Sequence, residues 1–244
     1  MISLLIALLL ISQSLSTTDL YVGYPNKDNN FNKIQKAIDE AAEINPKNES
    51  ERVTIHIAPG IYLQQLKIEV RYLTLLNEQP DAEVIITWYY GIGYKYYSVG
   101  TDGLYNKTRA KEQEEKTPCG GRWCATVHLF SKGLYFRAEN IIFENSFNRY
   151  IIEEEIEDGV ELSMETDIRV KRKKSLDPNT RNATERAAAF SVEGDYAEFL
   201  SCQFLSSQDT LFTGSSQEYF KNCLIERQTD NFLVEVMLFL ICAI

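Results

Sequence analysis

The sequence predicts an all-β solenoid, specifically a parallel β-helix, with one short helix near its N-terminus. Three observations lead to this fold class. After residue 53 the chain reads as strand-sized apolar runs separated by Gly, Asn, Asp and Pro. A segment of about 21 residues repeats near the C-terminal end. No second helical pattern of comparable length follows the first one.

The helix is expected in the segment FNKIQKAIDEAAE, which begins at Phe31. Its apolar residues Phe31, Ile34, Ile38 and Ala41 lie near the spacing of one helical face. Asn30 precedes them and is a residue type that often caps a helix N-terminus. We therefore expect one amphipathic helix to open the domain.

The strands are expected in the apolar and β-branched runs that follow the helix. Each run has the length of one or two strands and is bounded by turn residues. The runs are VTIHIAPGIYLQQLKI, YLTLLN, EVIITWYY, ATVHLF, LYFRAENIIFENS, RAAAFSVEG, AEFLSCQFLSS and EYFKNCLIE. Two polar and charged stretches, 91–122 and 150–185, interrupt them and are predicted to be surface loops inserted between core strands.

The internal repeat distinguishes a solenoid from other all-β folds. Laying SCQFLSSQDTLF over NCLIERQTDNFL superposes Cys202 on Cys223 and Asp209 on Asp230, each offset by 21 (223 − 202 and 230 − 209). Equivalent positions on adjacent coils of a parallel β-helix lie about 4.8 Å apart. The repeat therefore predicts that the two aspartates are vertical neighbours. The alternative is a coincidental match within a β-sandwich.

Cysteines give two candidate disulfides. Stacked Cys202 and Cys223 would lie within reach of a disulfide, although they could equally be two inert thiols in the coil interior. Cys119 and Cys124, in CGGRWC, could close a small loop around a glycine pair. A zinc site is the rival interpretation of this second pair, but no other Cys or His pair at ligand spacing accompanies it. We expect no metal and no cofactor.

Composition and charge limit the class of protein. The chain has 244 residues, enough for one domain with a substantial core, and a net charge of −10. This charge argues against nucleic acid as a partner, since such binding relies on cationic side chains. The basic run RVKRKK, 169–174, follows the acidic run at 153–158 and is interpreted as part of a solvated loop.

Residues 1–16 resemble a secretory signal peptide, with an apolar run followed by small polar residues before Thr17. The run is too short for a typical membrane span, so we expect no stable membrane insertion. Three glycosylation sequons begin at Asn48, Asn106 and Asn182, in polar stretches. We therefore expect a secreted glycoprotein, extracellular or in a cell wall.

Two stacked carboxyl groups suggest chemistry at Asp209 and Asp230. In partial burial they cannot both ionise easily, so one can act as an acid while the other acts as a nucleophile. Such a pair could cleave a glycosidic bond or open an ester, or it could be a structural ladder of turn aspartates. The two histidines, His56 and His128, lie in strand patterns away from the pair and are expected to be structural.

The segment GDYAEFLSCQFLSSQDTLF, followed by EYFKNCLIERQTDNF, resembles the pectin methylesterase family. APGIYLQQLKI is similar to the PG-x-Y-x-E block of that family, and RAAAF, 186–190, is similar to its QAVAL block. The resemblance implies a right-handed, single-stranded parallel β-helix at 17–233 that hydrolyses methyl esters of galacturonosyl residues in pectin. It also implies a monomer whose partner is methyl-esterified homogalacturonan.

Carried over by position, the resemblance implies a role for each site residue. Asp230 would be the nucleophile and Asp209 the acid and then the base. Gln208 would donate to the developing oxyanion. Phe212 would stack on a sugar face. Arg186 stands at the glutamine position of the QAVAL block, where it could bind substrate as a hydrogen-bond donor, pair with an aspartate or disable the site.

Several positions depart from the family pattern. Arg186 replaces a neutral glutamine and Gln64 replaces a glutamate, while Asn231, Leu233 and Val234 replace two aromatic residues and a glycine. The later LGRPW block has no counterpart, and the atypical hydrophobic tail 234–244 is expected to leave the coil pattern. The alternative to an esterase is thus a truncated, catalytically incompetent β-helix that binds pectic polysaccharide or has no function alone.

Overall fold

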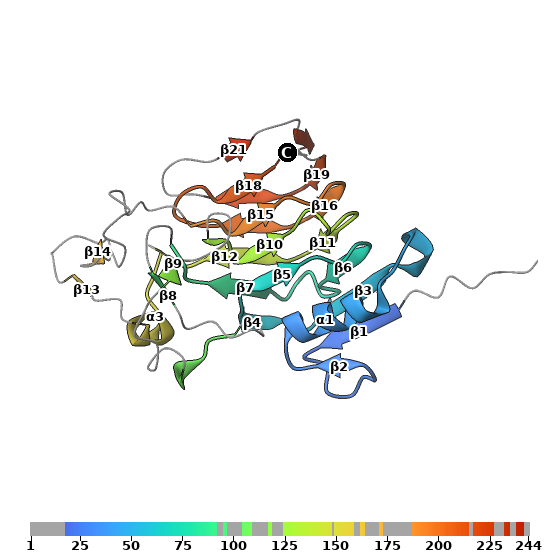
Figure 1. The fold of residues 1–244 in the computed structure, drawn as a ribbon, viewed down its shortest axis with the longest axis horizontal. Helices are drawn as coiled ribbons and strands as arrows, with labels where there is room; N and C mark the ends of the chain where they lie inside the picture. Colours follow the sequence, from blue (N-terminus) through green and yellow to red (C-terminus); the bar gives the residue numbers. More distant parts are fainter. Residues whose placement is uncertain are drawn as a thin grey trace, which may run out of the picture.

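A computed structural model describes residues 18–91, 95–96, 104–108, 117–118, 124–147, 149–158, 162–163, 171–172, 187–214, 217–226, 232–234 and 238–241. Most of the described strands form three parallel sheets, in which strands from successive coils of the chain pair with one another. Figure 1 shows these coils stacked in sequence order, from the blue N-terminal strands to the red C-terminal ones. The protein is a parallel β-helix, as the sequence predicts.

The largest sheet has the strand order β2-β1-β3-β6-β11-β16-β19-β22. Its strands are β1 (Thr18–Val22), β2 (Asn30–Phe31), β3 (Val53–Ile57), β6 (Leu73–Leu76), β11 (Arg137–Glu139), β16 (Ala197–Leu200), β19 (Glu218–Lys221) and β22 (Leu238–Ile241). β1, which the apolar pattern did not predict, pairs in parallel with β3 over five residues.

The other two large sheets have five strands each, in the orders β20-β17-β12-β7-β4 and β21-β18-β15-β10-β5. The first contains β4 (Gly60–Leu63), β7 (Val84–Trp88), β12 (Ile142–Asn145), β17 (Gln203–Leu205) and β20 (Leu224–Glu226). The second contains β5 (Leu66–Ile68), β10 (Val127–Leu129), β15 (Phe190–Val192), β18 (Leu211–Thr213) and β21 (Phe232–Val234).

The strand register confirms the 21-residue coil. Gln203 pairs with Leu224 and Leu211 pairs with Phe232, each an offset of 21 (224 − 203 and 232 − 211). Two different sheets therefore carry the same offset, which is the arrangement of a solenoid and not that of a sandwich.

Helix α1 (Ile34–Ile44) begins later than the sequence pattern suggests. Lys33 occupies the N-cap position, whereas Asn30 lies in β2, where its side chain accepts a hydrogen bond from the Tyr24 amide. The Oε1 atom of Gln64 instead accepts from the backbone amides of Ile34 and Gln35, at 3.0 and 3.3 Å. The predicted Asn30 cap is thus wrong, because a distant glutamine satisfies these orphan donors.

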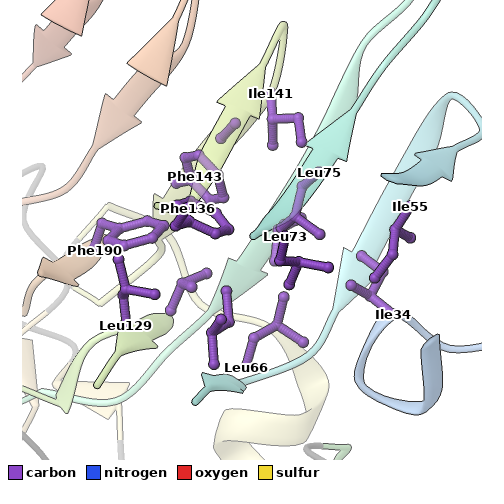
Figure 2. Packing of buried hydrophobic residues seen from close by; sticks show 14 of the residues in the cluster. Ile34, Ile55, Leu66, Leu73, Leu75, Leu129, Phe136, Ile141, Phe143 and Phe190 are labelled. Carbon is purple, nitrogen blue, oxygen red and sulfur yellow. The ribbon is translucent and has the colours of Figure 1, made fainter. Parts of the chain in front are cut away.

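The helix covers the N-terminal end of the stack. Figure 1 shows α1 beside β1 and β3, and its buried residues Ile34, Ala37, Ile38 and Ala41 belong to the main core cluster. Figure 2 shows aliphatic side chains such as Ile55 and Leu73 next to Ile34 of the helix, and phenylalanines farther from the helix, with Leu129 and Ile141 among them. The core therefore gains aromatic side chains along the solenoid axis.

The phenylalanines stack from coil to coil. The ring centroids of Phe143 and Phe204 are 5.5 Å apart, and those of Phe199 and Phe220 are 4.8 Å apart. Phe190 meets Phe143 and Phe199 edge-on. Such edge-to-face and stacked pairs add to the stabilisation that burial of the rings supplies.

Short elements lie within the two predicted insertions. They are the antiparallel strands β8 (Lys95–Tyr96) and β9 (Thr117–Pro118), the helix α3 (Glu153–Glu157) and the antiparallel strands β13 (Leu162–Ser163) and β14 (Lys171–Arg172). Figure 1 shows α3 beside the stack rather than within a coil. A 3₁₀ turn, η1 (Glu49–Glu51), precedes β3.

The C-terminal segment does not leave the coil pattern as expected. β22 (Leu238–Ile241) pairs in parallel with β19, and Leu238 lies opposite Glu218. A strand edge offers a row of backbone donors and acceptors, so an apolar β-prone segment can add another strand to it. The expected break in the coil at this segment is therefore wrong for these residues. In the part of the chain that the structure describes, no helix is long and apolar enough to cross a membrane.

Candidate functional site

The turn before β18 contains Gln208 and Asp209. Asp209 has a left-handed backbone with φ of 54°, a conformation that Asp tolerates better than most side chains. Asp209 is only 6 % exposed to solvent, whereas Gln208 is partly exposed. The structure thus places a carboxyl group in a buried turn and an amide beside it at the surface.

The preceding coil holds this turn through its backbone. The amide of Ala187 donates to the carbonyl of Gln208 at 3.0 Å, and the amide of Ala189 donates to the carbonyl of Thr210 at 2.9 Å. The two bonds lie on either side of Asp209 in the sequence. Ala187 and Ala189 therefore support the turn through their main-chain amides.

The following coil holds the same turn from the other side. The carbonyl of Glu226 accepts from the Ser206 amide at 3.3 Å and from the Thr210 hydroxyl at 3.1 Å. One carbonyl group therefore contacts residues on both sides of Asp209. The turn is fixed between two coils, which is the preorganisation that a reactive carboxyl group requires.

The register of the strands that follow the two aspartates has the 21-residue offset that separates Asp209 from Asp230 in the sequence. Leu211 pairs with Phe232, and Asp209 and Asp230 each stand two residues before these partners. Asp230 itself lies outside the described residues, as does Arg186. The nucleophile and the contact expected of Arg186 thus remain predictions, although the strands that follow both aspartates are in register.

Phe212 lies in β18, between Ser191 and Leu233 in the register of the sheet. Phe212 is 3 % exposed to solvent, so its ring is covered in this structure. A sugar needs an open ring face for stacking, and the exposure of Phe212 does not provide one. The stacking role predicted for Phe212 is therefore not supported by this conformation.

A second core cluster supports the coils below the turn. It consists of Trp88, Tyr89, Tyr90, Cys124, Phe147 and Ala187. The Trp88 ring stacks on Tyr89 at 4.8 Å and meets Tyr90 edge-on at 5.3 Å. Ala187 belongs to this cluster, and its amide donates a hydrogen bond to the Gln208 carbonyl. Ala187 therefore connects the aromatic cluster to the candidate site.

A buried carboxylate on the neighbouring sheet was missed by the sequence analysis. Glu144 accepts hydrogen bonds from the hydroxyl groups of Thr87 and Tyr150. Burial, and then the bond to Glu144, raises the pKa of Tyr150 to about 12. Arg149 lies beside the same carboxylate at 3.4 Å. Glu144, Arg149 and Tyr150 are close in the sequence but follow no motif, and Thr87 comes from another coil, so no sequence signal identified the group.

Both histidines have structural partners, as expected. The ring nitrogens of His56 lie 3.0 Å from Asp19 and 3.0 Å from Glu78, and its ring stacks on Tyr21. His128 stacks on Phe130, and its Nε2 atom lies 3.5 Å from a Glu193 carboxylate oxygen. Within the described ranges, no group of three or more His, Cys, Asp or Glu side chains could hold a metal ion.

The cysteines differ from the prediction in one pair. Cys202 and Cys223 are adjacent on neighbouring coils but are free thiols, so the stacked pair carries no disulfide in this structure. A hydrogen bond from Cys202 lowers the pKa of the Cys223 thiol, while burial raises the pKa of Cys202. Cys124 is disulfide-bonded, and its expected partner Cys119 lies outside the described residues.

Comparisons with known proteins point to one family. A family model described as Pectinesterase matches residues 154–243. The chain is 25 % identical to Probable pectinesterase 50 of Arabidopsis thaliana, over 80 % of this chain and 39 % of that protein. It is 27 % identical to Pectinesterase QRT1 of Arabidopsis thaliana, over 83 % of this chain and 42 % of that protein. The chain thus spans less than half the length of these relatives.

Solved structures agree on the fold. Pectin methylesterase PemA from Erwinia chrysanthemi superposes with a TM-score of 0.50 at 17 % identity, covering 87 % of this chain and 50 % of that one. Pectin methylesterase from carrot gives a TM-score of 0.50 at 19 % identity, covering 88 % and 48 %. The chain therefore resembles the pectinesterase family in sequence over about four fifths of its length and shares the parallel β-helix fold of pectin methylesterases.

Proposed function

We propose that the protein hydrolyses methyl esters of galacturonosyl residues in pectin and releases methanol. The family match and the curated relatives support this reaction class. The observation that carries the proposal is the turn at Asp209, a buried carboxyl group held between two coils. The 21-residue repeat predicts that Asp230 takes the equivalent position in the next coil. An aspartate that only shaped a turn would need neither burial between two coils nor a second aspartate in the next coil.

In the proposed first step, the Asp230 carboxylate attacks the ester carbonyl carbon and forms a covalent acyl-enzyme. Asp209, protonated at this stage, gives its proton to the departing methoxy group, which leaves as methanol. The burial of Asp209 suits this role, because a buried carboxyl group is more easily accommodated when it is neutral. The carbonyl oxygen gains negative charge as the new bond forms.

Gln208 is proposed to stabilise that charge. Its side-chain amide can donate a hydrogen bond to the oxyanion, and its backbone carbonyl is held by the Ala187 amide. In the second step Asp209, now ionised, removes a proton from water, which attacks the acyl-enzyme. This step releases the galacturonate carboxyl group, restores Asp230 and returns the proton to Asp209.

The proposal is tested by methanol release from highly methylated pectin. Asp209→Asn and Asp230→Asn should each lower the rate by at least about a hundredfold, the usual scale of a lost acid-base or nucleophilic group. Asp195→Asn is the matched control, since Asp195 also lies in a turn and its Oδ1 accepts from the Tyr196 and Gln217 amides. Equal activity of all three variants would refute the assignment of the two aspartates.

A β-helix that binds pectin without hydrolysing it is the competing function. Co-sedimentation of the protein with de-esterified and with methylated pectin, measured beside methanol release, distinguishes the binding function from the esterase function. Binding by folded wild-type protein together with no methanol release would replace the esterase proposal with this one. Methanol release that the two aspartate variants lose would exclude it.

We further propose that the protein acts outside the cell. The disulfide at Cys124 suits an oxidising compartment, where such bonds persist. N-terminal sequencing of protein recovered from the medium of a eukaryotic expression host tests the expected cleavage before Thr17. Protein retained in the cell with Met1 intact would contradict it.

A further inference from the structure

Arg149 lies between two carboxylates that come from distant parts of the chain. Its Nη1 atom donates to Glu226 Oε1 at 3.2 Å, and its Nε atom lies 3.4 Å from Glu144 Oε1. The second contact is an ion pair and not a hydrogen bond. The arginine side chain is 18 % exposed and that of Glu144 is 9 % exposed, whereas Glu226 is largely in solvent.

The two carboxylates stand on coils that do not touch each other directly. Glu144 of β12 pairs with Leu205 of β17, and Leu205 pairs with Glu226 of β20. The guanidinium group of Arg149 therefore spans the coil of Leu205. It links the middle of the stack to the coil that precedes Asp230 in the sequence.

The Glu144 end of this link is rigid. Besides Arg149, the Glu144 carboxylate accepts hydrogen bonds from the Thr87 and Tyr150 hydroxyl groups, and its residue is 7 % exposed. A buried carboxylate with several partners keeps one orientation, because losing any partner is costly. Arg149 is thus held from one side by a fixed anion.

The Glu226 end reaches the candidate site. The Glu226 carbonyl accepts from the Ser206 amide and the Thr210 hydroxyl, which bracket Asp209. Glu226 also stands four residues before Asp230. A shift of the Glu226 backbone would therefore loosen the Asp209 turn and move the start of the segment that leads to Asp230.

We propose that Arg149 is a positioning residue, which holds the Glu226 coil against the Asp209 turn and so sets the relative placement of the two aspartates. The inference rests on the proposed function for its catalytic consequence, but the structural link stands independently of it. Among the described residues, Arg149 forms ion pairs with Glu144 and Glu226 and not with Asp209. Its effect on reaction is therefore transmitted through Glu226.

The test compares Arg149→Met with the matched control Arg137→Met. Arg137 forms an ion pair with Glu198 at 2.7 Å between adjacent strands of the largest sheet. Both changes remove a cation and an inter-coil ion pair while keeping a long side chain, and Arg149→Met also removes the contact with Glu144. In hydrogen exchange, Arg149→Met should speed exchange of the Ser206 amide about five- to tenfold, while Arg137→Met leaves it unchanged.

Methanol release is the second readout. Arg149→Met should lower kcat by about tenfold or more with KM within about twofold of the wild-type value, because a small misplacement of reacting groups slows chemistry more than binding. Arg137→Met should leave both constants unchanged. Arg149→Lys should keep only part of the wild-type kcat, since an ammonium group cannot contact both carboxylates as the guanidinium fork does.

Each outcome is decisive. Unchanged Ser206 exchange in Arg149→Met would overturn the structural link whether or not the protein releases methanol. Faster exchange with unchanged kcat, or a rise in KM alone, would overturn the positioning role. A wild-type chain that releases no methanol would refute the proposed function, while the exchange measurement would still test the link from Arg149 to the turn.

Discussion

Oxidation of the Cys202 and Cys223 pair should lock two coils together. Cys223 has the lowered pKa and is partly exposed, so its thiolate should attack glutathione disulfide first and release one glutathione. Cys202 then displaces the second glutathione. The two thiols lose two electrons and two protons, and the glutathione disulfide becomes two glutathione thiols.

The stabilisation follows from the loop that the bond closes. Residues 202 and 223 are 21 apart (223 − 202), and closing a loop of this length removes enough unfolded-state entropy to add about 3 kcal/mol to the free energy of unfolding. The Cα atoms of neighbouring parallel strands lie about 4.8 Å apart, within the range that a disulfide accepts. No large backbone movement is therefore required.

The assay is urea unfolding of the reduced and the oxidised chain, with thiol counting and intact mass on each sample. Cys202→Ala should stop at the mixed disulfide on Cys223, and Cys223→Ala should react far more slowly, because burial raises the pKa of Cys202. Wild-type protein that keeps both thiols in excess oxidant, or that forms the bond without gaining stability, would refute the reasoning.

Three further perturbations test the packing and the titration. Phe199→Ala removes a ring that contacts other core phenylalanines and should cost about 3–5 kcal/mol in urea unfolding, against little change for the exposed control Ile61→Ala. Gly194→Ala would place a Cβ atom 2.3 Å from the carbonyl oxygen of Gly133, so the backbone must shift, and the loss should be about 1–3 kcal/mol by the same measurement. Since the pKa of Tyr150 is about 12 in the folded protein and 10.0 ordinarily, its contribution to stability is complete below pH 10 and is lost as pH rises towards 12. Tyr150→Phe should flatten the fall of Tm between pH 10 and 12, and an unchanged slope would contradict the assignment.

Gln64 illustrates how a position can be interpreted in two ways. In the sequence it is a departure from a glutamate of the family block, whereas in the structure its side chain accepts from two amides at the start of α1. The two amides, of Ile34 and Gln35, lie 30 and 29 residues before Gln64 in the chain. A long-range cap of this kind leaves no periodic trace, so only the folded chain reveals it.

The sequence was sufficient to predict the solenoid and its 21-residue coil, which the strand register confirms. It also predicts that Asp209 and Asp230 occupy equivalent positions. These follow from a repeat in which each coil meets its neighbour in the same register, so local pattern and three-dimensional neighbourhood coincide. The apolar residues that fill the core follow from the same alternation.

The surroundings of the repeated positions depend on the folded chain. The burial of Phe212 and the contacts of Arg149 with Glu144 and Glu226 depend on side chains from several coils. The pairing of β22 with β19 likewise depends on an open strand edge and not on a motif. Such interactions join residues with no fixed spacing in the chain, and their strength depends on distance and burial that a repeat pattern does not encode.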